Sequence, residues 1–123
     1  MPGRGKRVLI ADDNAFMRLT LRRLLEQNGH SVVGEAKDGA EAVRKYQELK
    51  PDLVTLDITM PEMDGLAALK AILRLDPAAR VIMCTAMGQR PIVAEAMACG
   101  ARDFVVKPFR PHQVLQAIAR LGP

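Results

Sequence analysis

Residues 7–18 read RVLIADDNAFMR, a short apolar run followed by three polar residues and the start of a helical pattern. A short apolar run that ends at polar residues is typical of a buried strand. Met17, Leu21 and Leu25 then recur at the spacing of one helix face. The stretch therefore predicts a strand over Arg7–Ala11, a polar turn, and a helix.

The same pattern continues along the chain. Four further apolar runs predict strands at Ser31–Ala36, Leu53–Asp57, Arg80–Thr85 and Asp103–Val106. A helical period follows each of them, and helix stop signals stand at Asn28–Gly29, Pro51, Pro77 and Gly100. Strict alternation of strand and helix requires right-handed crossovers, so we expect an α/β fold with a parallel sheet covered by helices on both faces.

Length and composition favour one compact domain. The chain has 123 residues, of which 49% are hydrophobic and 26% charged, and it shows no repeat or linker. Residues 1–6 are expected to form a flexible N-terminal tail. The apolar runs are too short to cross a bilayer and the N-terminus lacks a secretory signal, so we expect a cytoplasmic protein without membrane contact.

Composition and spacing argue against nucleic-acid binding, a disulfide and a zinc site. The net charge is +4, but the basic residues are spread over many segments and aromatic residues make up only 3% of the chain, so direct nucleic-acid binding is not expected. Cys84 and Cys99 are expected to be reduced, buried thiols, because their spacing fits neither a redox pair nor a disulfide framework. His30 and His112 are too isolated to form a zinc site.

Polar residues stand at the ends of four predicted strands: Asp12 and Asp13, Asp57, Thr85, and Lys107. In a parallel sheet these ends share one edge, so we expect a single site. Three carboxylates held together repel one another unless they share a cation, and Mg²⁺ suits carboxylate, carbonyl and water oxygens. Asp13 and Asp57 are the expected direct ligands, with Asp12 acting through a water. Lys107 and Thr85 can hold two oxygens of a phosphoryl group.

Each of these residues also has an ordinary interpretation. Asp12, Asp13 and Asn14 can cap the first helix, and Thr85 can simply end a strand. Capping requires neither Asp57 nor Lys107, so the set as a whole favours a site. The sequence contains no GxxxxGK[ST] loop, no GxGxxG after the first strand and no nucleophile elbow, which excludes the common nucleotide-binding and hydrolase sites.

Four segments carry a resemblance to a known family: IADDNAFMR, LVTLDITMPEMDG, VIMCTAMG and DFVVKPF. Together they resemble the receiver domain of two-component response regulators, above all its chemotaxis members, and the likeness covers nearly the whole chain. The resemblance implies a doubly wound (βα)5 domain whose five-stranded sheet has the flavodoxin-like order 2-1-3-4-5.

The resemblance also implies roles for single residues. Asp57 accepts the phosphoryl group, and Thr85 and Lys107 contact it. Phe104 is the switch aromatic, although a static core position is the alternative, and Lys107–Pro108 is a cis peptide. The implied metal ligands are Asp12, Asp13, Asp57 and the backbone carbonyl of Thr59.

Two features depart from the common pattern of the family. Phe104 lacks the hydroxyl of the tyrosine found in many members. Thr59 and Met87 occupy the positions that tune the lifetime of the phosphoryl group, and neither side chain suits the orientation of a hydrolytic water, so slow self-dephosphorylation is expected.

The leading functional hypothesis is a stand-alone, monomeric chemotaxis messenger. It takes a phosphoryl group from a histidine kinase resembling CheA, signals to the flagellar motor switch protein, and depends on a separate phosphatase. It is a signalling domain, with self-phosphorylation from phosphohistidine or small donors and no further enzyme activity. The alternatives are a receiver excised from a DNA-binding response regulator and, less favoured, a Mg²⁺-dependent aspartyl phosphohydrolase.

Overall fold

The structure is a computed structural model that describes residues 5–60, 62–86 and 90–122. Strands and helices alternate along these residues. Their bounds are β1 (Arg7–Ala11), α1 (Ala15–Gln27), β2 (Ser31–Ala36), α2 (Gly39–Leu49), β3 (Leu53–Asp57), α3 (Gly65–Leu75), β4 (Val81–Thr85), α4 (Arg90–Cys99), β5 (Asp103–Val106) and α5 (Pro111–Arg120).

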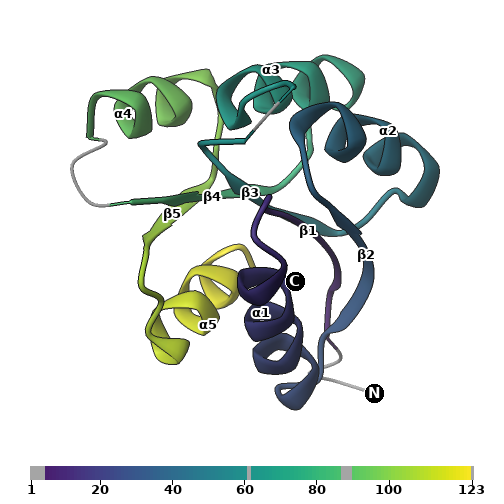
Figure 1. Ribbon diagram of the computed structural model, residues 1–123, viewed down its shortest axis with the longest axis vertical. Coiled ribbons are helices and arrows are strands. Elements are labelled where there is room, and N and C mark those ends of the chain that lie inside the picture. Colours follow the sequence, from purple (N-terminus) through teal and green to yellow (C-terminus); the bar gives the residue numbers. More distant parts are fainter. Residues whose placement is uncertain (1–4, 61, 87–89, 123) are drawn as a thin grey trace.

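The strands form one parallel sheet in the order β2-β1-β3-β4-β5, which confirms the expected doubly wound arrangement. Helices α1 and α5 cover one face of the sheet, and α2, α3 and α4 cover the other (Figure 1). All strands point the same way, so their carboxyl ends open onto a common edge.

Each face of the sheet has its own apolar core. Leu9, Leu56 and Leu69 belong to the core beneath α2, α3 and α4. Ile10 and Leu25 belong to the core beneath α1 and α5. The central strands β3 and β4 are buried along their whole length, because helices cover both of their faces.

Local signals set the ends of the elements close to the expected positions. Strand β4 begins at Val81, one residue later than the sequence pattern suggested. Asn14 is the N-cap of α1, and its side chain accepts a hydrogen bond from the backbone N–H of Met17 at 3.0 Å. Because Asn14 alone fills this cap position, Asp12 and Asp13 are not needed for capping.

The two cysteines have free thiols. Cys84 is buried as expected, whereas Cys99, the last residue of α4, is only partly buried.

The N-terminal segment is described from Gly5 onward, and residues 1–4 of the expected tail lie outside the described residues. The Lys6 backbone N–H donates to His30 Nδ1 at 3.0 Å, and the Lys6 ammonium donates to the Gly122 carbonyl at 2.6 Å.

Among the helices placed, none combines the length and the apolar character that a bilayer crossing requires.

Candidate functional site

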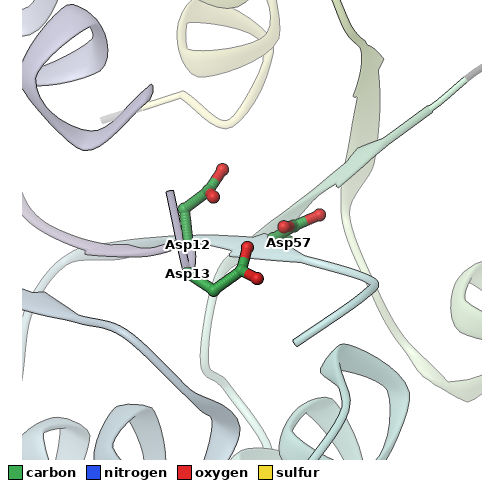
Figure 2. Close-up of side chains that lie close together, drawn as sticks. All are labelled: Asp12, Asp13 and Asp57. Carbon is green, nitrogen blue, oxygen red and sulfur yellow. The ribbon is translucent and has the colours of Figure 1, made fainter. Parts of the chain in front are cut away.

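Three carboxylates meet at the carboxyl edge of the sheet. Asp12 and Asp13 follow β1, and Asp57 ends β3. One oxygen from each side chain can be chosen so that all three lie within 4.8 Å of one another. Figure 2 shows the three side chains gathered at the ends of these two strands. The predicted gathering of these three carboxylates at one edge is therefore present in the fold.

Strand pairing explains why Asp12 and Asp57 are neighbours. Ala11 and Leu56 are register partners in the parallel pair of β1 and β3, so the next residue of each strand lies beside the other. The backbone N–H of Asp12 donates to the Ala36 carbonyl at 3.0 Å, which ties the end of β1 to β2. Asp12 and Asp57 are buried, whereas Asp13 is exposed.

Lys107 brings the opposing charge to the same edge. Its ammonium lies 2.8 Å from Asp12 Oδ2 and 3.3 Å from Asp57 Oδ2. The backbone N–H of Lys107 donates to the Thr85 carbonyl at 2.7 Å, which joins the ends of β4 and β5. The Lys107–Pro108 peptide is cis, as the resemblance implied.

The carboxylates at this edge carry more negative charge than the Lys107 ammonium can neutralise. Burial raises the pKa of Asp57, and the negative charge of Asp12 raises it further. The Lys107 ammonium and the Thr59 backbone N–H act in the opposite direction but do not cancel the rise. Burial alone would lower the pKa of Lys107, but its contacts with Asp12 and Asp57 raise it above the ordinary value. A divalent cation would relieve this repulsion, and hard carboxylate oxygens suit Mg²⁺.

Thr85 lies at the end of β4 with 2% of its surface exposed. Its hydroxyl donates a hydrogen bond to the Ala86 carbonyl at 3.0 Å. The hydroxyl is therefore engaged locally in this conformation. Its predicted contact with a phosphoryl group stays a prediction.

Phe104 lies on β5 with its side chain outward, and 41% of its surface is exposed. It borders a hollow of about 280 Å³ that is also lined by Val106, Gln113 and Arg120. Phe104 is therefore not buried in the core in this conformation. The predicted role of Phe104 as the switch aromatic stays a prediction.

The backbone around Thr59 supports Asp57. The Thr59 side chain is exposed, and its backbone N–H donates to the Asp57 carboxylate. The predicted role of its carbonyl as a metal ligand stays a prediction. Met87, the second position expected to tune phosphoryl lifetime, lies outside the described residues.

Gly65 contributes to the site in a way that the sequence analysis missed. Its backbone N–H donates to the Ile58 carbonyl at 2.7 Å. A Cβ at this position would overlap the Asp57 carbonyl oxygen and the Ile58 Cα, so only glycine allows α3 to begin so close to the end of β3. The available signal was a glycine directly after the N-cap Asp64, in the motif that contains Asp57.

Comparisons with known proteins agree with this geometry. The family model described as the response regulator receiver domain matches residues 8–119. A chemotaxis protein CheY from Thermotoga maritima is 56% identical over 118 residues, which cover 96% of this chain and 98% of that protein. A chemotaxis protein CheY from Bacillus subtilis is 58% identical over 112 residues, covering 91% and 93% of the two chains.

A solved structure is similarly close. It is the crystal structure of a CheX-CheY-BeF₃-Mg²⁺ complex from Borrelia burgdorferi. The matched chain superposes with a TM-score of 0.90 at 41% sequence identity, and the match covers 94% of this chain and 87% of the other.

Proposed function

The chain belongs to the response regulator receiver domain family, and from this premise we propose that Asp57 accepts a phosphoryl group from a histidine kinase and thereby switches the affinity of the domain for a flagellar motor switch protein. The observation that carries the proposal is the position of Asp57, which is 6% exposed beside two other carboxylates and the Lys107 ammonium. A buried carboxylate with a raised pKa in such a cluster is typical of a chemical site.

The proposed metal ligands are Asp13, Asp57 and the Thr59 carbonyl, with Asp12 acting through a water. The carboxylate oxygens are close enough to share one ion, and the family as a whole binds Mg²⁺ at an acidic pocket. When bound, Mg²⁺ would supply positive charge to the oxygens of the transferring group.

The proposed chemistry is a single displacement at phosphorus. An oxygen of Asp57 forms a bond to the phosphorus, and the bond from phosphorus to the donor nitrogen of phosphohistidine breaks, leaving its electron pair on that nitrogen. A small acyl phosphate can act as donor in the same way, with oxygen as the leaving atom. Lys107 holds a negatively charged phosphoryl oxygen, and the chain otherwise positions the groups. The protein is a signalling domain rather than a classical enzyme.

The proposed switch begins at Thr85. An acyl phosphate carries close to two negative charges and adds acceptor oxygens. The Thr85 hydroxyl gives up its hydrogen bond to the Ala86 carbonyl and donates to one of these oxygens instead. Phe104 then turns into the space that this movement opens. The surface of α4, β5 and α5 then differs between the two states, which allows a partner to discriminate between them.

Chemotaxis is the favoured setting because the similarity to the CheY proteins extends over nearly their full lengths. We propose that residues 1–123 act as one receiver domain in the cytoplasm, with a histidine kinase upstream. The Borrelia relative was crystallised with a second protein, CheX, in the presence of beryllofluoride and Mg²⁺. A separate protein of that kind is proposed to remove the phosphoryl group here.

Binding to a motor switch protein tests the proposed output. The purified chain is titrated onto an immobilised motor switch protein with Mg²⁺, in the presence and absence of beryllofluoride, which mimics the phosphoryl group. Binding should tighten with beryllofluoride, and the Asp57→Asn variant should show no such gain. Equal binding in both conditions would exclude this partner as the output.

A further inference from the structure

Arg18 lies one turn into α1 and reaches back to the acidic turn. Its Nη1 donates to the backbone carbonyl of Asp12 at 2.7 Å, and its Nε donates to Glu35 Oε1 at 3.0 Å. The side chain of Arg18 is 18% exposed. A planar guanidinium held at two edges has little freedom left, so it fixes the atoms to which it is bonded.

The carbonyl that Arg18 holds belongs to the peptide between Asp12 and Asp13. The other polar groups of Asp12 are also bonded: its N–H to Ala36, Oδ1 to the backbone N–H of Asn14 and Oδ2 to Lys107. The Asp13 carboxylate, by contrast, has no hydrogen bond or ion pair within residues 5–60, 62–86 and 90–122. Its placement in the cluster therefore depends on the orientation of the peptide that Arg18 holds.

Glu35 makes this arrangement compatible with a cation site. Its second oxygen accepts from Arg22 Nε at 2.8 Å, and its backbone carbonyl accepts from the Lys45 ammonium at 2.5 Å, so β2, α1 and α2 all hold it in place. Partial burial would by itself raise the pKa of Glu35, but the hydrogen bonds from Arg22 and Arg18 lower it below the ordinary value. The ionised carboxylate therefore offsets the positive charge of Arg18, which would otherwise repel a metal ion nearby.

We propose that Arg18, anchored by Glu35, is a positioning residue for the metal site: it orients the Asp12–Asp13 peptide so that the Asp13 carboxylate faces Asp57. The inference rests on the proposed Mg²⁺ site. Outer groups that orient metal ligands typically change metal affinity by about 10–100-fold when they are removed. We expect a change in Mg²⁺ affinity at the lower end of this range, because Arg18 orients only one of the proposed ligands.

The test compares Arg18→Met with Arg22→Met. Both substitutions remove one positive charge from α1 and one partner from Glu35, but only Arg18 touches Asp12. Removing a positive charge should by itself strengthen cation binding, so a weaker Mg²⁺ affinity in Arg18→Met cannot be a charge effect. The Mg²⁺ dissociation constant is measured by titrating MgCl₂ and following backbone amide resonances by NMR. Unfolding midpoints are measured in EDTA for each variant.

The expected result is that Arg18→Met raises the dissociation constant about 10-fold, whereas Arg22→Met leaves it unchanged or lowers it. An Arg18→Met variant that binds Mg²⁺ as tightly as Arg22→Met would overturn the inference. If Arg18→Met does not fold, Arg18→Lys decides, because a single ammonium cannot reproduce the two-edged contact and should also weaken binding relative to the parent. Absence of Mg²⁺ binding in the parent would instead refute the proposed metal site itself.

Discussion

The Lys107 ammonium lies 2.8 Å from Asp12 Oδ2, so the cation expected to meet a phosphoryl group is already bound within the acidic cluster. In the proposed metal site, Asp12 would therefore face both Lys107 and, through a water, the metal ion. In the proposed switch, a phosphoryl oxygen replaces the Asp12 carboxylate as the partner of Lys107.

Loss of Lys107 should destabilise the metal-free fold. Lys107→Ala leaves buried Asp12 and Asp57 without their cation, and we expect the free energy of unfolding to fall by about 1–3 kcal/mol. Because Lys107 is 23% exposed, solvent screening favours the lower part of this range. Urea unfolding in EDTA measures the effect. Lys70→Ala, which removes an exposed pair to Glu95 at 3.7 Å, is the matched control and should change little. A similar fall in the free energy of unfolding for both variants would contradict a stabilising role of Lys107 in the acidic cluster.

Removal of the Asp57 charge should stabilise the metal-free fold at neutral pH. Burial and the Asp12 charge raise the pKa of Asp57 above its ordinary value of 3.8. The carboxyl group therefore contributes most stability below the unfolded-state pKa, and this contribution is lost as pH rises through the folded-state pKa. Metal-free Asp57→Asn should be more stable than the parent at neutral pH, and the difference should vanish in acid. Thermal unfolding from pH 4 to 8 checks this. A stability difference between Asp57→Asn and the parent that stays constant over that range would contradict a raised pKa of Asp57.

Thr55 should tolerate loss of its hydroxyl. It lies in the middle of β3 with 2% exposure, and its Oγ1 has no hydrogen-bond partner among the described residues. An unsatisfied buried hydroxyl costs about 1–3 kcal/mol, so Thr55→Val should leave stability unchanged or increase it. Thr85→Val is the comparison, because that hydroxyl is bonded to the Ala86 carbonyl and its removal should lower stability. If Thr55→Val lowered stability as much as Thr85→Val, the Thr55 hydroxyl would have a hydrogen-bond partner in solution.

Phe104 should couple phosphorylation to partner binding through burial alone. Its ring is 41% exposed, and burial of a large apolar side chain yields about 1.5–3 kcal/mol before costs. Phe104→Ala should keep phosphorylation of Asp57 but reduce the beryllofluoride-dependent gain in affinity for a motor switch protein. Phe104→Tyr should preserve or enlarge that gain. Titrations in which Phe104→Ala gains as much affinity as the parent would show that the coupling runs elsewhere.

The sequence predicts most of the fold because its signals are local. Apolar runs and helix stop signals placed the strands within one residue of their observed bounds, including the late start of β4 at Val81. Parallel strands bring their carboxyl ends to one edge, so the meeting of Asp12, Asp13 and Asp57 also followed from pattern and topology.

The contacts inside the site could not be predicted in the same way. The pairing of Lys107 with Asp12 depends on side-chain geometry between residues 95 positions apart in the chain. Arg18 was counted among the dispersed basic residues, because no local pattern reveals that its guanidinium meets Glu35 of β2 and the Asp12 carbonyl. The need for glycine at position 65 likewise appears only when the start of α3 lies against the end of β3.

The most direct test of the central claim is phosphoryl incorporation at Asp57. The chain is incubated with acetyl phosphate and Mg²⁺, and the bound phosphoryl group is counted by intact mass. Its acid stability and base lability identify it as an acyl phosphate, and the Asp57→Asn variant gives its position. The account predicts one such group per chain, none in Asp57→Asn, and none when EDTA removes the metal. Incorporation in Asp57→Asn equal to that in the parent would contradict the assignment of Asp57 as the acceptor.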